Sequence, residues 1–273
     1  MAGSARSLWK GSISFGLVNI PVNLYSATED RSFSFNQLCK NGHRIQYKRW
    51  CPVENREVPY DEIRKGYEVS KDNYVLIDKA DLRAVRVEST KTIDIREFID
   101  MEELDPIFVE KSYYVGPDSR KGVEKAYSLL VSILGNTKKA GIGKVVLRDR
   151  EQIVALRAYQ RGIVMHVLHY IDEIRPIDEI KGIGEAASER TKTDDKEMQL
   201  GRTLVEQLAA NGFDASQYTD VYSKEIQKLI EAKAKGRQVL VAPEGEGRLS
   251  PTPDLLEALK ASIKKTSSGR GKK

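Results

Sequence analysis

The residues with the clearest chemistry lie between Asp30 and Glu54, where no acidic side chain occurs. Tyr47 and Trp50 are interleaved with the cations of this segment, which are Arg31, Lys40, Arg44, Lys48 and Arg49. Cationic side chains neutralise phosphates and release condensed counterions, and this contact requires no reading of bases. The aromatic rings could stack on exposed bases, or they could hold the other face of a hairpin. The segment therefore predicts contact with a nucleic acid.

Positive charge is also concentrated at the two ends of the whole chain. Residues 1–53 carry seven Lys and Arg against two acids, and residues 260–273 carry six against none. Subtracting these from the totals of 45 and 40 leaves 32 basic and 38 acidic residues in the middle. This polarity predicts that one end of the core and the C-terminal tail face a polyanion, while the middle avoids it. Chance clustering on a solvated surface is the alternative.

Two groups of residues have the types that bind metal ions. Cys39, His43 and Cys51 supply only three ligands, whereas a structural zinc takes four. Two acidic doublets either side of Arg175 could serve a metal-dependent nuclease or phosphotransfer enzyme, and they are Asp172 with Glu173 and Asp178 with Glu179. These acids equally fit a solvated turn or an ion pair with Arg175. We expect no metal and no cofactor, and the nuclease remains the competing hypothesis.

Two further patterns are weak signals. Residues 140–144 (AGIGK) lack the spacing of a phosphate loop, because Val145 stands where a magnesium-binding hydroxyl would be. They are interpreted as a turn that enters a strand. His166 and His169 fall on opposite faces of one predicted strand, so they cannot share a metal or a substrate.

Composition limits the class of protein. The chain has 273 residues, of which 40% are hydrophobic and 31% charged, and this suits one or two globular domains. No apolar run reaches the roughly 18 residues of a membrane-spanning helix, and the first 20 residues lack the pattern of a secretory signal. Two cysteines are too few for a disulfide framework. We therefore expect a soluble, cytoplasmic protein without a membrane partner.

The elements that would position the basic segment are mostly strands. Alternating apolar residues predict strands around 13–24, 92–98 and 111–115, and a short buried run at 74–77. One helix is predicted at 123–134, followed by a three-strand meander at 144–148, 152–159 and 163–171. Short strands with few helices favour an antiparallel barrel or sandwich, because a parallel sheet would need helices between most strands.

After about residue 190 the pattern becomes helical. Apolar residues at helical spacing predict helices over 198–208 and 222–230, and a Gly- and Pro-rich stretch, 236–253, is typical of a linker. Thr252 and Pro253 then predict the start of a short helix, whose apolar stripe is Leu255, Leu256, Leu259 and Ile263. The stripe suits a peptide that docks into a partner's groove, or a helix that folds back on the body.

Several motifs in this order resemble one known family. The run WKGSISFGLVNIPV at 9–22, continued by LYSAT at 24–28, is similar to the opening of bacterial Ku, the DNA end-binding family of non-homologous end joining. Further matches span about residues 8–236: IQYKRWC at 45–51, KGYE at 65–68, TIDI at 92–95, SYY at 112–114, PD at 117–118, AY at 126–127, LL at 129–130, HY at 169–170 and DEIR at 172–175. Some relatives carry Cys-x-x-Cys where this chain has Cys51-Pro52-Val53-Glu54, so a metal-binding bridge is not expected.

The resemblance implies a mainly β fold with α elements. It implies a Ku-type β-barrel core with a strand-rich bridge, followed by a helical arm and a flexible C-terminal extension. The implied domains are the core at 1–190 including a bridge at about 30–90, a dimer-embracing arm at 191–236, a linker at 237–251, a docking helix at 252–264 and a basic tail at 265–273.

The resemblance also implies a function without catalysis. Two chains would form a homodimeric ring that threads onto a double-stranded DNA end and recruits the multifunctional ATP-dependent end-joining DNA ligase. DNA contacts are expected from Lys10, from the five cations named above, and from Lys264, Lys265, Arg270, Lys272 and Lys273. Ligase docking is expected from the stripe of Leu255, Leu256, Leu259 and Ile263. A third possibility is a general nucleic-acid-coating protein, which would treat circles and linear fragments alike.

Overall fold

The computed structural model describes residues 6–85, 90–120, 122–183, 195–236 and 255–269. The chain divides into two compact units, Met1–Arg175 and Pro176–Lys273, which are described separately. Among the described residues, no helix is long and apolar enough to cross a membrane.

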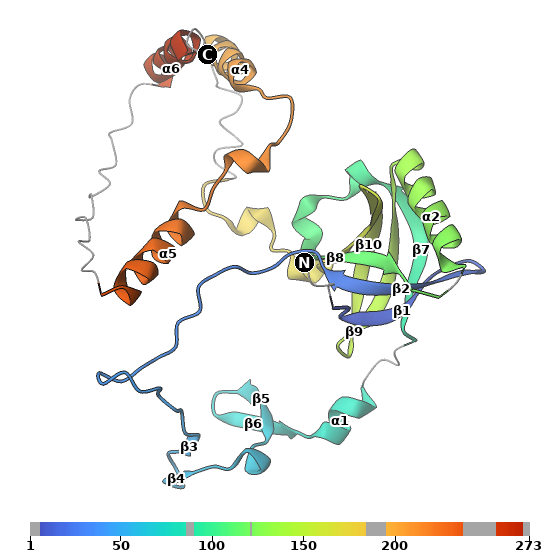
Figure 1. The fold of residues 1–273 in the computed structure, drawn as a ribbon, viewed down its shortest axis with the longest axis vertical. Helices are drawn as coiled ribbons and strands as arrows, with labels where there is room; N and C mark the ends of the chain where they lie inside the picture. The colour runs from blue at the N-terminus through green and yellow to red at the C-terminus, as the bar shows by residue number, and fades with distance from the viewer. Residues whose placement is uncertain (1–5, 86–89, 121, 184–194, 237–254, 270–273) are drawn as a thin grey trace. The chain divides into compact units, whose positions relative to one another are not determined.

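The core of the first unit is a closed β-barrel (Figure 1). Around the barrel the strands follow the order β1 (Trp9–Phe15), β2 (Val18–Ser26), β8 (Val109–Pro117), β11 (Gly162–Leu168), β10 (Arg150–Tyr159), β9 (Lys139–Leu147) and β7 (Thr92–Asp100). Each neighbouring pair is antiparallel except β1 and β7, which close the barrel in parallel. The predicted mainly β barrel and its three-strand meander are thus confirmed.

Alternation along the strands builds the barrel interior. Every second residue points inward, so Ile13, Val154, Leu156 and Met165 are completely buried. Helix α2 (Val123–Thr137) confirms the predicted helix and buries Tyr127, Leu130 and Leu134 against the same core.

The Tyr127 hydroxyl fixes α2 to one end of the barrel. Its Oη donates to the Val115 carbonyl at 2.5 Å and accepts from the Ile163 amide at 3.0 Å. Val115 lies near the end of β8 and Ile163 near the start of β11, so α2 closes the barrel at this end. Figure 1 shows α2 lying against the strands there.

The glycines of the AGIGK motif lie inside β9 and not in a turn. Gly143 is paired with Ile95 of β7, and a Cβ at this position would lie 2.3 Å from the Asp94 carbonyl oxygen. Glycine is therefore required because the backbones of β7 and β9 approach closely. The prediction of a strand-entry turn is wrong, since the glycines mark close packing between strands.

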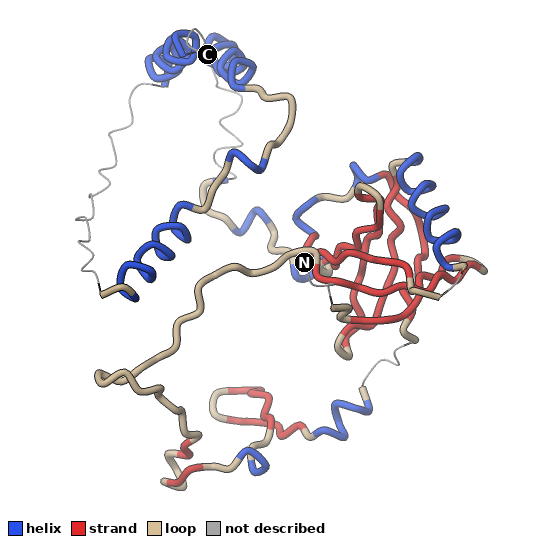
Figure 2. Tube along the Cα trace, viewed as in Figure 1, coloured by secondary structure: helices blue, strands red, loops and turns tan. Residues whose placement is uncertain are grey.

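The segment between β2 and β7 has a different construction. It contains two small sheets, β3 (Trp50–Cys51) with β4 (Arg56–Glu57) and β5 (Lys65–Ser70) with β6 (Asn73–Ile77), followed by α1 (Lys79–Ala84). Figure 2 shows these strands as short red stretches of the tube joined by tan loops and turns. All residues from 29 to 85 are described, and none of them is buried.

One prediction for this segment is wrong in part. Residues 74–77 do form a strand, but Tyr74, Val75 and Leu76 are exposed where a buried run was expected. Strand β6 pairs with β5 in a sheet of two, so neither face of the ribbon has a layer of protein over it. An apolar run in the sequence predicts a strand but does not show whether other parts of the chain bury it.

The second unit is helical, as predicted. It contains α4 (Asp195–Leu208), α5 (Val221–Ala234) and α6 (Leu255–Gly269). Helix α6 packs against α4: Leu259 shares one groove with Gly201 and Val205, and Leu256 shares another with Leu200 and Thr203. The predicted linker at 237–251 and the predicted cap at Thr252 and Pro253 lie outside the described residues.

Candidate nucleic-acid interface

The first part of the basic segment is a small hairpin. Leu38 and Arg44 form an isolated β-bridge, and the amide of Cys39 donates to the His43 carbonyl at 2.9 Å. Gly42 turns the chain with φ of 82°, in the left-handed region that glycine tolerates. The turn presents Lys40 to solvent, while the Arg44 guanidinium donates to Asn36 Oδ1 at 2.8 Å.

The second part of the basic segment leads into β3 and β4. The Lys48 Nζ lies 2.8 Å from Glu57 Oε2, and this hydrogen bond raises the pKa of Lys48. The Arg49 guanidinium lies 5.1 Å from the centre of the Tyr60 ring, in a cation–π arrangement. Both cations remain on the surface, so they are accessible to a polyanion.

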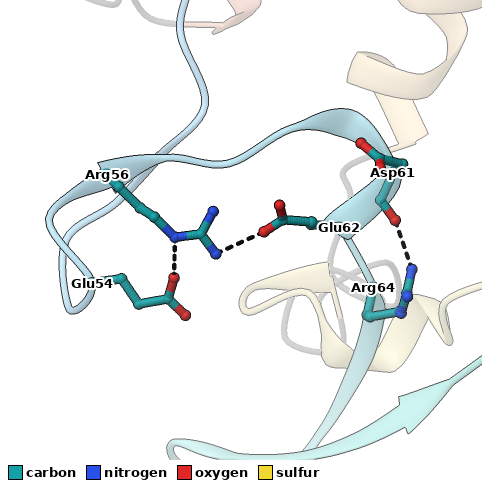
Figure 3. Close-up of polar contacts among 5 residues, drawn as sticks. All are labelled: Glu54, Arg56, Asp61, Glu62 and Arg64. Carbon is teal, nitrogen blue, oxygen red and sulfur yellow. Dashed lines mark hydrogen bonds and ion pairs between the residues drawn. The ribbon is translucent and has the colours of Figure 1, made fainter.

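A cluster of charges fixes the loop after β3. Arg56 Nε lies 2.6 Å from Glu54 Oε2 and its Nη2 lies 2.7 Å from Glu62 Oε2, so one guanidinium joins two carboxylates (Figure 3). Arg64 Nη1 donates to the Asp61 carbonyl at 2.8 Å. Two carboxylates occupy Arg56, which leaves it less free to contact a phosphate than Lys40.

Pairing across β3 and β4 is a feature that the sequence analysis missed. Residues 31–53 contain no acid, but Glu57 of β4 lies beside Lys48 because the hairpin folds back at Asn55, where φ is 53°. The positive segment is therefore bordered in space by acids that follow it in the sequence. Prediction of a hairpin over residues 50–57 would have placed Glu57 near Lys48.

The remaining predicted DNA contacts are Arg31 at the start of the basic segment and cations of other elements. Lys10 is on β1 of the barrel, and Arg31 lies 3.6 Å from Glu29 in an exposed ion pair. Lys264 and Lys265 are exposed on α6 of the second unit. Arg270, Lys272 and Lys273 lie outside the described residues.

The predicted docking stripe has a neighbour in its own chain. Leu256, Leu259 and Ile263 are half-buried on α6, and Leu256 and Leu259 line grooves shared with α4. Leu255 is the first residue of α6. The sequence left two readings open, and in this structure the helix packs on its own chain.

The residues of the competing metal sites do not gather. Cys39 Sγ lies 3.6 Å from His43 Nδ1, and the backbone N–H of His43 lowers the pKa of the thiol. Among the residues that the structure describes, no three His, Cys, Asp or Glu side chains could together hold a metal ion. Glu173 accepts from the Tyr170 amide at 3.0 Å, and this bond lowers the pKa of its carboxyl group.

The two histidines also have separate surroundings. His166 is buried on the outer side of the barrel, where Arg157 Nε donates to its Nε2 at 2.9 Å and its Nδ1 lies 2.8 Å from Ser112 Oγ. His169 follows the end of β11, with Nδ1 3.3 Å from Glu173 Oε2. Burial, with Arg157 nearby, lowers the pKa of His166.

The basic segment as a whole can hold a polyanion by charge but offers no catalytic constellation. Its cations are exposed and none of its residues is buried, and exposed cations can neutralise phosphates without reading bases.

Comparison with known proteins adds independent information. Residues 14–200 match the family model described as the Ku70/Ku80 beta-barrel domain. The chain is 42% identical over 259 residues to a "Non-homologous end joining protein Ku" of Archaeoglobus fulgidus, covering 94% of this chain and 98% of the relative. It is 39% identical over 259 residues to a protein of the same name from Heliobacterium modesticaldum, covering 94% and 91%. A third of that name, from Bacillus subtilis, is 37% identical over 263 residues, covering 96% and 82%.

Proposed function

The chain belongs to the Ku family of non-homologous end joining proteins, and on this premise we propose that it binds double-stranded DNA ends as a homodimeric ring and recruits the end-joining ligase. The core at 1–190 carries the DNA-encircling bridge at about 30–90. The arm at 191–236 embraces the second subunit, and the docking helix and basic tail follow the linker. The protein performs no catalytic step and acts in the cytoplasm, at the nucleoid when bound to DNA.

The observation that carries the proposal is the bare construction of residues 29–85. This segment exposes Tyr47, Trp50, Tyr67 and Leu76, and a two-stranded ribbon without a layer over it is marginally stable in water. Exposed aromatic and aliphatic side chains gathered in one segment suit a site of interaction. A second copy of the chain would cover one side of the bridge, and DNA phosphates would face Lys40, Arg44, Lys48 and Arg49 on the other.

Helix α5 supports the dimer. Tyr222, Ile226 and Ile230 lie on one face of α5 at helical spacing, and Tyr222 and Ile230 are exposed. Among the described elements, none packs extensively against α5. A two-fold dimer buries the same patch twice, so a modest stripe on each arm yields a large interface.

The ligase contact requires a change in the second unit. The stripe that would dock to the ligase includes Leu256 and Leu259, and α4 covers part of both. Recruitment through this face therefore requires that α6 leave α4. Docking would then depend on the difference between two free energies: that of α6 packed on α4 and that of α6 bound to the ligase.

Trapping on DNA tests the proposed ring directly. A linear duplex carrying biotin at both ends is loaded with protein, and streptavidin is then added before excess competitor DNA. A ring stays on the blocked duplex, whereas streptavidin added before the protein prevents loading. Equal dissociation whether the ends are blocked or open after loading would contradict encirclement.

The oligomeric state is measured on the same preparation. Analytical ultracentrifugation of the full chain should give a dimer. Substitution Tyr222→Glu with Ile230→Glu on α5 should shift it toward the monomer, while Lys228→Glu on the same helix is the matched control. A monomeric wild-type protein would contradict the dimer.

A further inference from the structure

The end of the barrel opposite α2 holds a pocket of about 340 Å³. It lies where β8 begins, β11 ends and the β9–β10 turn meets them, and it is lined by Lys111, Tyr113, Arg148, Arg150, His169 and Tyr170 among others. The mouths of β-barrels are common places for ligand sites, and pockets of about 300–1,000 Å³ hold small molecules. None of these residues belongs to the bridge.

Backbone geometry fixes the cations of this pocket. Arg148 and Asp149 have φ of 49° and 73°, the two positive values of a tight hairpin turn between β9 and β10. The turn joins paired strands of the barrel, so the backbone places the exposed residues Arg148 and Arg150 at the rim. Lys111 is in register with Val167, a buried residue of the interior face. The Nζ of Lys111 lies 5.5 Å from the centre of the Tyr113 ring.

The charge of the pocket favours an anion. Within the described part of the chain, Lys111, Arg148 and Arg150 form no ion pair at 4.0 Å or less. Two carboxylates, Glu110 and Glu173, also line the pocket. Glu173 accepts from the Tyr170 amide and lies beside His169, and the Arg150 charge also helps to lower its pKa. With His169 neutral, the three cations of the lining exceed its two carboxylates by one charge, and this excess favours an added negative group.

The chemistry of these side chains selects phosphate. The planar guanidinium fork donates two parallel hydrogen bonds to phosphate oxygens, and lysine adds a compact charge. The half-buried rings of Tyr113, His169 and Tyr170 line the same space, which exceeds the size of a bare phosphate ion. An aromatic surface beside a phosphate site suits a base or a sugar.

We propose that the barrel mouth binds the phosphate of a nucleotide, through Arg148, Arg150 and Lys111. The nucleotide is either free or is the 5′-terminal residue of a DNA strand. The free-nucleotide form is independent of DNA end binding, and only the DNA form rests on the proposed function.

Calorimetric titration of the full chain tests the free form. Deoxyadenosine monophosphate should bind the wild type, and deoxyadenosine, which lacks the phosphate, should not. Arg148→Glu with Arg150→Glu should weaken the nucleotide at least tenfold. Arg161→Glu is the matched control, because Arg161 is exposed on the β10–β11 turn at the other end of the barrel. Arg148→Lys with Arg150→Lys should restore part of the affinity, since it keeps charge without the fork.

Short duplexes test the DNA form. A 5′-phosphorylated duplex should bind the wild type more tightly than its 5′-hydroxyl twin, and the Arg148→Glu, Arg150→Glu variant should lose this preference. Circular dichroism and a thermal melt establish that each variant is folded. If the variant loses nucleotide binding, the site binds a free nucleotide. If it loses the preference for a 5′-phosphate, the site binds the end of a DNA strand. If the variant matches the wild type in both measurements, the proposal is overturned.

The bridge variant separates this site from the proposed function. Lys48→Glu with Arg49→Glu should bind deoxyadenosine monophosphate as the wild type does, because those cations lie outside the pocket. If the wild type showed no preference for DNA ends but needed Arg148 and Arg150 for the nucleotide, end binding would fail while the barrel-mouth site stood. A loss of nucleotide binding in the bridge variant equal to that in the barrel-mouth variant would contradict the assignment to this pocket.

Discussion

The barrel and residues 29–85 differ in how much of their side-chain surface is buried. The barrel buries its own side chains, such as Ile13, Val154 and Leu156, and α2 closes one end. Residues 29–85, which cover most of the proposed bridge at about 30–90, bury none of their side chains and expose rings and aliphatic groups along their length. The barrel's shape is therefore specified by contacts within the chain, whereas the proposed function assigns the contacts of residues 29–85 to DNA and a second copy.

The largest expected difference between the two regions is in stability. Leu156→Ala in the barrel should lower the free energy of unfolding by about 2–5 kcal/mol, because it leaves a cavity among fully buried neighbours. Val53→Ala in the bridge should change it by about 0.5 kcal/mol or less, because Val53 is 91% exposed. Urea denaturation of both variants measures the contrast. Equal losses would show that the bridge is packed as firmly as the barrel.

The next largest effect is on DNA binding. Lys48→Glu with Arg49→Glu should weaken binding to linear duplex and flatten its salt dependence by about 0.9 per lost phosphate contact on a log–log plot. Measurement of the binding constant over a series of salt concentrations gives the slope. An unchanged slope would remove these two residues from the interface.

The partner of Lys48 gives a matched variant of opposite sign. Glu57→Gln removes the carboxylate that lies 2.8 Å from Lys48, without reversing a cation. Freed from that ion pair, Lys48 should bind phosphate more readily, so the affinity for linear duplex should rise. A fall in affinity would mean that Glu57 positions Lys48 for DNA instead of competing with it.

A smaller effect is expected at the C-terminal helix. Deletion of residues 252–273 should leave dimer formation intact and reduce the stimulation of the ligase. Leu200→Ala with Val205→Ala on α4 should loosen its contact with α6 and raise the stimulation at low ligase concentration. Ligation assays on nicked and broken duplexes measure both. Full stimulation after the deletion would contradict docking through α6.

The smallest expected effect is the pH dependence of the barrel. Burial holds the pKa of His166 below its ordinary value of 6.5, so below that pH the unfolded chain binds a proton that the folded barrel excludes. The contribution of His166 is complete above about pH 6.5 and is lost as the pH falls toward the folded pKa. Melting temperatures between pH 7.5 and 5 should fall less steeply for His166→Gln than for the wild type. Parallel curves would show that His166 does not titrate on unfolding.

The two regions also differ in how far their sequence predicts them. Alternation at Ile93 and Ile95 and helical spacing around Tyr127 predict the barrel, because burial on one face leaves a period in the sequence. The apolar run at 74–77 misleads, because the same composition serves a core strand and a ribbon that awaits a partner. Gly143 misleads in the opposite direction. Glycine in a sequence suggests a turn, but here it allows the backbones of β7 and β9 to approach closely.

The basic segment shows the same limit at the level of the site. Sequence locates the cations at Lys40, Arg44, Lys48 and Arg49, but it cannot show that Glu57 folds back onto Lys48. The barrel mouth was overlooked for a related reason: Lys111 is distant in sequence from Arg148 and Arg150, and strand pairing alone brings them to one pocket.

The central claim is that topology, and not affinity for a sequence, selects DNA ends. A gel-shift competition at about physiological salt, between a linear duplex and the same sequence as a relaxed closed circle, tests it most directly. The ring predicts that the linear form wins by a wide margin and that capping both ends removes the advantage. Equal competition by circle and linear duplex would contradict threading and would indicate general coating of the DNA backbone.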